Sequence, residues 1–237
     1  MNLGIRDIIA IGVPYLIAVS ACYLFGYWGT FHINALEFIS FADIAKLAIY
    51  PLVISLGFFF IGLLTSQLVL APFFPPGGGA SSVIGKAGIT HWRILVFGEV
   101  FLITVVYFFV PEPTKWLVIA MLAGPLSIPL THLDKVIQFV PDPSTRATFL
   151  FLVVLLPPLS FAEGRQDAFK VKANSAAQFV DVSRSQLPLT SDEKNPVAYL
   201  GYLGNVYILR ESKTGQIIIV KQHDDHPLFL SPKPSNQ

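Results

Sequence analysis

Hydrophobic residues gather into five stretches over the first two thirds of the chain, and polar residues lie between them; the last two stretches are short. The stretches cover residues 8–27, 47–74, 94–110, 116–130 and 147–162. The second contains no charged residue and is longer than the roughly 20 residues that a helix needs to cross about 30 Å of hydrocarbon. A helix of a soluble protein is seldom so long and apolar on every face. The pattern therefore predicts an integral membrane protein.

Prolines interrupt several of these stretches. Pro14 lies in the first, which we interpret as an uncleaved membrane span because no A-x-A-like cleavage site follows it. Pro125 and Pro129 break the fourth stretch, and Pro157 and Pro158 break the fifth. Either all five stretches span the membrane, or one of the last two is re-entrant and four span. Counts of lysine and arginine place both chain ends inside with four spans and give a near tie with five.

The segment between the first two stretches, residues 26–46, is rich in aromatic residues and has its single lysine at its end. Tyr27, Trp28, Phe31, Phe38 and Phe41 are of the types that form an aromatic belt at a membrane surface. The segment therefore predicts a short amphipathic stretch that lies along the outer interface.

Beyond residue 162 the pattern becomes that of a small β domain. Residues 168–172 and 177–182 alternate between apolar and polar, as strands do. Residues 206–211 and 216–221 are rich in β-branched and aromatic types, and Gly215 can take a positive φ between them, which predicts a hairpin. Gly201 and Gly204 predict a bend or bulge in the strand before it. A compact sheet of about four or five strands is expected.

These observations divide the chain into a transmembrane helical domain (1–162), a small β-rich domain (163–230) and a disordered tail (231–237). The expected fold class is an α-helical membrane bundle of four to five transmembrane segments, followed by a small mainly-β C-terminal domain. At its size the β domain would be marginal alone, so we expect it to pack on the membrane part or on a partner.

The composition of the chain limits the classes of function that it can have. The net charge is +1, so no basic field for nucleic-acid binding exists, and direct nucleic-acid binding is not expected. Charged residues make up 13% of the chain, about half the usual share in soluble domains. Cys22 is the single cysteine, which excludes a disulfide within the chain and a cysteine metal cluster. No cofactor is expected.

Glu99 is the strongest candidate for a functional residue, because a carboxylate inside a membrane span is costly. It could serve a proton or cation site or form half of an interhelical pair. The alternative is that it reaches the interface or hydrogen-bonds locally. In the second stretch, Thr65, Ser66 and Gln67 predict polar contacts between helices, with a pore lining as the functional alternative.

Other chemistry has weak signals. His223 and His226, with two aspartates between them, could hold a metal, although such residues after a strand more often face solvent in a turn. Residues 77–86 are glycine-rich but miss the spacing of a phosphate-binding loop. No catalytic motif is present, so we do not expect an enzyme; an enzyme at the membrane surface that uses the two histidines is the third hypothesis.

Two portions of the chain, GYWGTFHINALEFISFADI and the tail with AEGRQDAFKVKA and YLGYLGNVYILRESKTGQIIIV, resemble a loose group of small bacterial multi-span membrane proteins with a C-terminal β domain. The resemblance covers about a third of the chain and includes no catalytic motif. It implies a bacterial inner membrane and no activity.

The leading hypothesis is a membrane sensor or scaffold subunit of the kind found in bacterial multi-gene systems, including defence systems. Its helices would pack with copies of themselves in the lipid bilayer, and its β domain, expected in the cytoplasm, would engage a soluble protein partner. Tyr207, Arg210 and Lys221 are the candidate partner-binding residues. The alternative is a small ion channel or pore that uses Glu99.

Overall fold

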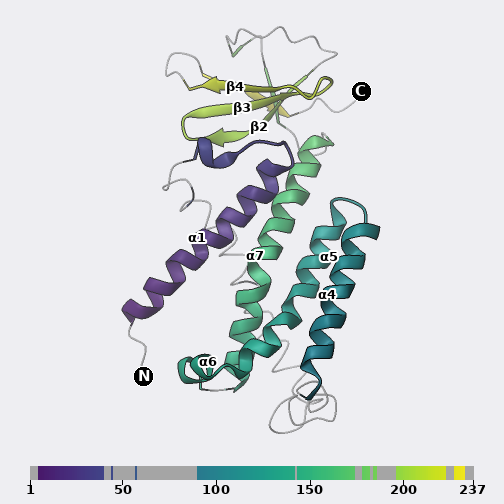
Figure 1. Cartoon of the computed structure of the whole chain (residues 1–237). Coiled ribbons are helices and arrows are strands. Elements are labelled where there is room, and N and C mark those ends of the chain that lie inside the picture. The colour runs from purple at the N-terminus through teal and green to yellow at the C-terminus, as the bar shows by residue number, and fades with distance from the viewer. Residues whose placement is uncertain are drawn as a thin grey trace.

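The computed structural model describes residues 5–39, 44, 57, 90–141, 143–173, 178–181, 184–185, 196–222 and 227–232. The helices are α1 (Ile5–Gly29), η1 (Ala35–Glu37), α4 (Trp92–Phe109), α5 (Thr114–Ala123), η5 (Gly124–His132), α6 (Asp134–Phe139) and α7 (Pro143–Lys172). The strands are β1 (Gln178–Val180), β2 (Val197–Leu203), β3 (Val206–Glu211), β4 (Ile217–Lys221) and β5 (Leu230–Pro232). Helices followed by a small antiparallel sheet confirm the predicted class in its coarse form (Figure 1).

Three helical segments of the described chain are long and apolar enough to cross a membrane: Trp92–Phe109, Thr114–Thr131 and Arg146–Lys172. The third, fourth and fifth predicted stretches correspond to these segments. The second predicted stretch, residues 47–74, lies almost entirely outside the described residues. The chain is therefore a membrane protein by the length and composition of its helices.

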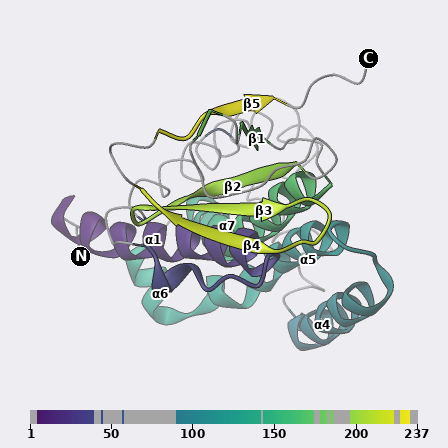
Figure 2. The ribbon, with the colours of Figure 1, turned by 90° about the horizontal axis from the view of Figure 1, so that it is seen from above.

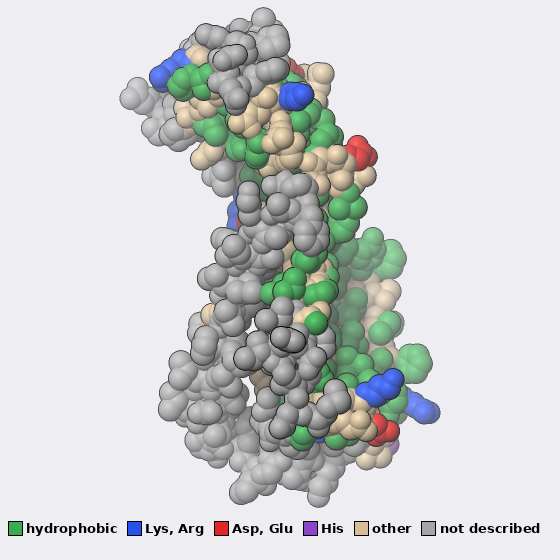
Figure 3. All heavy atoms as spheres, turned by 90° about the vertical axis from the view of Figure 1, so that its left-hand side faces the viewer, with side chains coloured by type: hydrophobic (Ala, Val, Ile, Leu, Met, Phe, Trp, Pro, Cys, Tyr) green, Lys and Arg blue, Asp and Glu red, His purple; other side chains and the backbone are tan. Residues whose placement is uncertain are grey.

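Charged residues mark two levels along the bundle. Arg93 and Arg146 lie where α4 and α7 begin, and Glu112 and Arg165 meet at the other end of α4. The segment of α7 from Arg146 to Arg165 is about 28 Å long, and α4, with 18 residues, is about 27 Å long. This matches the roughly 30 Å of a hydrocarbon core. Figure 3 shows hydrophobic side chains in a band with charged side chains above and below it.

α7 carries the sheet beyond this band. Its 30 residues correspond to about 45 Å, longer than the hydrocarbon core. It runs across the boundary predicted between residues 162 and 163, and the strand predicted at 168–172 is wrong because these residues form the last turns of α7. The apolar–polar alternation there fits either structure over so short a stretch. The strand predicted at 177–182 is confirmed as β1.

Pro157 and Pro158 do not break α7, which was predicted to be short and interrupted there. A proline at position 157 cannot donate a backbone hydrogen bond to the carbonyl of Val153, four residues earlier. The hydroxyl of Tyr15, on α1, donates to that carbonyl at 2.9 Å instead. A neighbouring helix thus satisfies the group that proline leaves free, as happens in membrane bundles.

α1 and α7 pack backbone to backbone over their upper halves (Figure 1). A Cβ on Gly26 would overlap the carbonyl oxygen of Phe161, and a Cβ on Gly164 would overlap that of Tyr23. Small residues recur at four-residue intervals on both helices. They are Cys22 and Gly26 on α1 with Thr30 directly after its end, and Ser160, Gly164 and Ala168 on α7. Such spacing lets membrane helices approach closely.

The five strands form one antiparallel sheet in the order β4-β3-β2-β1-β5. Seen from above, β2 and β3 lie over α1 and α7 (Figure 2). The predicted hairpin is confirmed as β3 and β4, and Gly215 between them has a φ of +72°. The predicted bulge is confirmed at Gly201, where the pairing of β2 with β3 shifts register.

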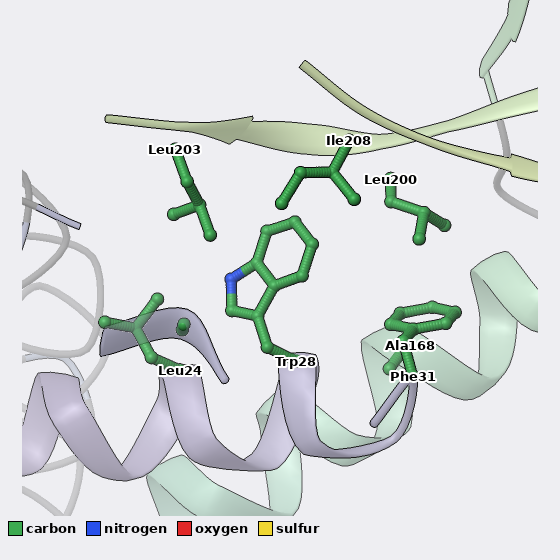
Figure 4. Packing of buried hydrophobic residues seen from close by; sticks show 8 residues of the cluster. Leu24, Trp28, Phe31, Ala168, Leu200, Leu203 and Ile208 are labelled. Atoms are coloured by element: carbon green, nitrogen blue, oxygen red, sulfur yellow. The ribbon is translucent and has the colours of Figure 1, made fainter. Parts of the chain in front are cut away.

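The end of α1 lies under the sheet. Trp28 is 4% exposed and Phe31 is 8% exposed, and they pack with Leu200 and Ile208 of the sheet and Ala168 of α7 (Figure 4). The prediction that Trp28 and Phe31 form an aromatic belt is therefore wrong. Both lie in a core that the helices and the sheet share, because the sheet covers the apolar surface that would otherwise meet lipid headgroups.

The bulge in β2 fits this junction. A Cβ on Gly201 would lie 3.1 Å from two atoms of the Trp28 ring, so glycine allows the indole to approach the strand. Leu200, the extra residue of the bulge, has no partner in the register of β2 and β3. Its carbonyl accepts a 2.7 Å hydrogen bond from the hydroxyl of Tyr27. Two adjacent side chains of α1 thus hold the strand at one point.

Candidate functional site

Glu99 lies on α4, six residues after Arg93 and about 9 Å along the helix from it. Its surroundings on this helix are apolar, and its own side chain is half-buried. The residue therefore lies within the hydrophobic band, about 9 Å from the level where the charged residues of α4 begin.

A cavity of about 380 Å³ opens beside Glu99, between α4 and η5. η5 exists because Gly124 and Pro125 end α5, and Pro129 removes a further backbone donor. A Cβ on Gly124 would overlap the ring of Phe151 on α7, so this break also lets α5 and η5 lie close against α7. Pro125 and Pro129, which lie at this break in the helix, form part of the cavity wall.

The carboxylate of Glu99 has no hydrogen bond or ion pair with any residue in the part of the chain that the structure describes. The expected local hydrogen bond or interhelical pair is thus not found among these residues. A carboxylate in an apolar environment must bind a proton or be paired with a cation, because an isolated charge there costs several kcal/mol. The geometry therefore fits a site that accepts a cation or a proton.

A second cluster links the α4–α5 turn to α7. The Glu112 carboxylate pairs with Arg165 at 3.3 Å and with Lys115 at 2.9 Å, and the Trp116 indole donates to it at 2.9 Å. The guanidinium of Arg165 also lies 5.2 Å from the centre of the Trp116 ring. These contacts fasten the helical hairpin to α7 at one edge of the hydrophobic band.

We expect the Glu112–Arg165 pair to contribute a coupling energy of about 1 kcal/mol, because both side chains are largely shielded from water. The measurement is a double-mutant cycle on the free energy of unfolding with Glu112→Gln and Arg165→Gln. The pair of Asp167 and Lys170, which is more exposed, is the matched control and should couple by a few tenths of a kcal/mol or less. Equal coupling in the two cycles would contradict the role given to Glu112.

The candidate partner-binding residues lie at different places in the sheet. The Arg210 guanidinium approaches the carbonyl of Lys172 at 3.5 Å, so it lies at the C-terminus of α7, where a positive charge is favourable. Tyr207 is half-buried on the sheet's other face, with its ring 6.4 Å from that of Tyr199. Lys221 is exposed at the end of the edge strand β4. The structure does not bring the three together.

The tyrosines on this face of the sheet make the free energy of unfolding depend on pH. Burial raises the pKa of Tyr199 above its ordinary value of 10.0, and the neighbouring phenols of Tyr207 and Tyr202 add to the effect. The folded state thus holds this proton more tightly than the unfolded chain does. The contribution of the protonated Tyr199 to the free energy of unfolding is therefore complete below pH 10 and is lost as the pH rises through the folded pKa. The free energy of unfolding should fall above pH 10, and less steeply in Tyr199→Phe. The same slope in both proteins would contradict this assignment.

Several predicted site residues lie outside the described residues, namely Thr65, Ser66, Gln67, His223 and His226. Among the described residues, no group of three or more histidine, cysteine, aspartate or glutamate side chains could hold a metal ion. Neither the Glu112 cluster nor the contact of α1 with α7 was predicted from the sequence. The four-residue spacing of small residues was the signal for the contact, whereas no sequence pattern joins Glu112 to Arg165.

No family model, curated protein or solved structure matches this chain.

Proposed function

We propose that the chain is an integral membrane sensor or scaffold subunit, which assembles with copies of itself in a bacterial inner membrane and engages a soluble partner through its C-terminal sheet. The observation that carries this proposal is the junction at Trp28. Because this residue of α1 lies inside the core of the sheet, a shift of α1 against α7 moves the sheet surface as well. Such a connection suits a subunit that passes a change in the membrane to a partner in the cytoplasm. A cytoplasmic sheet requires Trp28 and Phe31, which pack against it, to lie on that side as well, and not at the outer interface predicted for their segment.

The edge strand β4 supports partner binding. It pairs with β3 on one side, and among the described residues no strand pairs with its other side. An edge with free backbone groups can accept a strand from another chain. Ile219 in this strand is 48% exposed, and Lys221 is exposed beside it, so the edge offers both an apolar and a charged side chain.

The outer surface of α4 supports self-assembly. Ile94, Phe97, Phe101 and Phe108 are between 68% and 76% exposed. Their intervals of three, four and seven residues place them along one stripe of the helix, which is the pattern of helices that pair. A second copy of the chain could cover this stripe in the bilayer.

The test places a photo-crosslinking residue at Lys221 in the full-length protein in its own membrane, with native mass spectrometry of the solubilised protein in parallel. We expect a defined homo-oligomer and one discrete protein adduct from Lys221, and we expect Trp28→Ala to weaken the adduct. A photo-crosslinker at Lys135 on α6, at the other end of the bundle, is the matched control and should not give this adduct. A monomer with no adduct at Lys221 would contradict the proposal.

An ion pathway through Glu99 is the second proposal, favoured by the cavity beside a broken helix. The cavity lining supports an ion pathway less well, because Glu99 is the single charged residue among its described members and ions need several polar groups along their path. Flux in reconstituted vesicles that Glu99→Gln abolishes would favour this alternative over the sensor, whereas no flux would remove it.

A further inference from the structure

We infer that the cavity beside Glu99 binds a lipid-soluble amine, with its protonated nitrogen on the carboxylate and its apolar groups along the wall formed by α4 and η5. This goes beyond the proposed function, because it assigns a ligand to the membrane-embedded part. The volume of about 380 Å³ falls within the range of small-molecule pockets. Leu95 lines the cavity, lies outside the stripe assigned to self-assembly and is 50% exposed, so a ligand can enter from the bilayer.

The lining residues favour an amine over an inorganic cation. Glu99 is the one charged side chain among the lining residues that the structure describes, and the others are apolar or, at Trp92, an indole. A metal ion of the calcium or magnesium type needs six or more oxygen ligands, which these side chains do not supply. A protonated amine needs only the carboxylate for its N–H groups, and its hydrocarbon part gains from the rest of the wall.

The depth of Glu99 favours an amine without a negative charge. An aminophospholipid would bring its phosphate close to the ammonium group, and no positively charged side chain among the described lining residues could receive it. Arg93, the nearest cation on α4, lies about 9 Å along the helix, with its guanidinium over the Trp92 ring at 5.6 Å. A buried phosphate without a partner would cost more than the ammonium pair gains.

The experiment uses the full-length protein in phosphatidylcholine vesicles, which contain no primary amine. A terminally brominated dodecylamine is added, and its bromine quenches tryptophan fluorescence on contact. Brominated dodecanol of the same length is the neutral comparison, with both concentrations expressed per lipid. The difference between the unmodified protein and Trp92→Phe isolates the signal of the tryptophan that lines the cavity. We expect the amine to quench Trp92 at about tenfold lower concentration than the alcohol does.

Glu99→Gln keeps the shape of the side chain and removes its charge, so it should remove the preference for the amine. Glu99→Asp keeps the charge and should keep most of the preference, which guards against an effect of misfolding. Asp134→Asn is the matched control, because it removes an exposed carboxylate at the same end of the bundle. It should leave the preference unchanged.

Three results would overturn the inference. An equal preference in the Glu99→Gln protein would mean that the amine only concentrates in the bilayer. Loss of the preference when phosphatidylethanolamine is added to the vesicles would assign the cavity to an aminophospholipid. If potassium chloride removed the preference for the amine, and the chloride salt of a bulky organic cation at the same concentration did not, the cavity would be assigned to an inorganic cation.

Discussion

Replacing Trp28 with alanine is expected to release the sheet from α1 and α7 and to lower the free energy of unfolding by about 3 to 5 kcal/mol. The indole is 4% exposed and fills the space between Leu203 and Ile208 of the sheet (Figure 4). No neighbouring side chain can fill that space without moving the strand, because Gly201 faces the ring directly. Unfolding by denaturant in mild detergent gives the free energy, and amide hydrogen exchange shows which strands lose protection.

Trp92→Ala is the matched control, since Trp92 is 40% exposed and lies far from the sheet at the start of α4. It should change the free energy of unfolding by less than about 1 kcal/mol and leave exchange in the sheet unaltered. A Trp28→Ala protein as stable as the Trp92→Ala protein would contradict the shared core.

Gly164→Ala is expected to force α1 away from α7 and to cost about 3 kcal/mol. The added methyl group would meet the backbone carbonyl of Tyr23, which cannot rotate away as a side chain does. Gly26→Ala should act in the same way, through the carbonyl of Phe161. The hydroxyl of Tyr15 would also lose its acceptor at Val153 if the helices separated.

Gly12→Ala separates the effect of contact from the general effect of glycine in a helix. Gly12 lies within α1, and a Cβ there would have no atom of the described residues within 4 Å. Alanine should stabilise the helix by about 0.5 to 1 kcal/mol at this position. Thermal unfolding in the same detergent compares the variants. If Gly164→Ala were as stable as Gly12→Ala, the close approach of the two helices would be wrong.

The hairpin and the third membrane helix could be predicted because their signals are local. Val206–Glu211 is rich in β-branched and aromatic residues, and Gly215 marks its turn. Trp92–Phe109 is apolar over a membrane's thickness. The continuation of α7 through Pro157 could not be predicted. The helix tolerates this proline because Tyr15 bonds to the carbonyl of Val153, and the two residues are 138 positions apart in the sequence.

The place of Trp28 could not be predicted for a similar reason. An aromatic residue at the end of an apolar helix suits a membrane interface as well as a protein core. Only the sheet, formed by residues far along the chain, decides between the two. Glu99 could be identified because a carboxylate is rare in an apolar helix, but the cavity beside it depends on the pairing of α4 with η5.

Labelling of single cysteines tests most directly whether the bundle crosses the membrane with the sheet on one side. Cys22→Ala gives a chain without cysteine, into which Lys213→Cys, in the turn after β3, or Lys135→Cys, on α6, is introduced. These positions lie at opposite ends of the helices (Figure 1). With a membrane-impermeant maleimide on intact cells, one position should be labelled at once and the other only after permeabilisation. Labelling of both positions from the same side would contradict a bundle that spans the membrane.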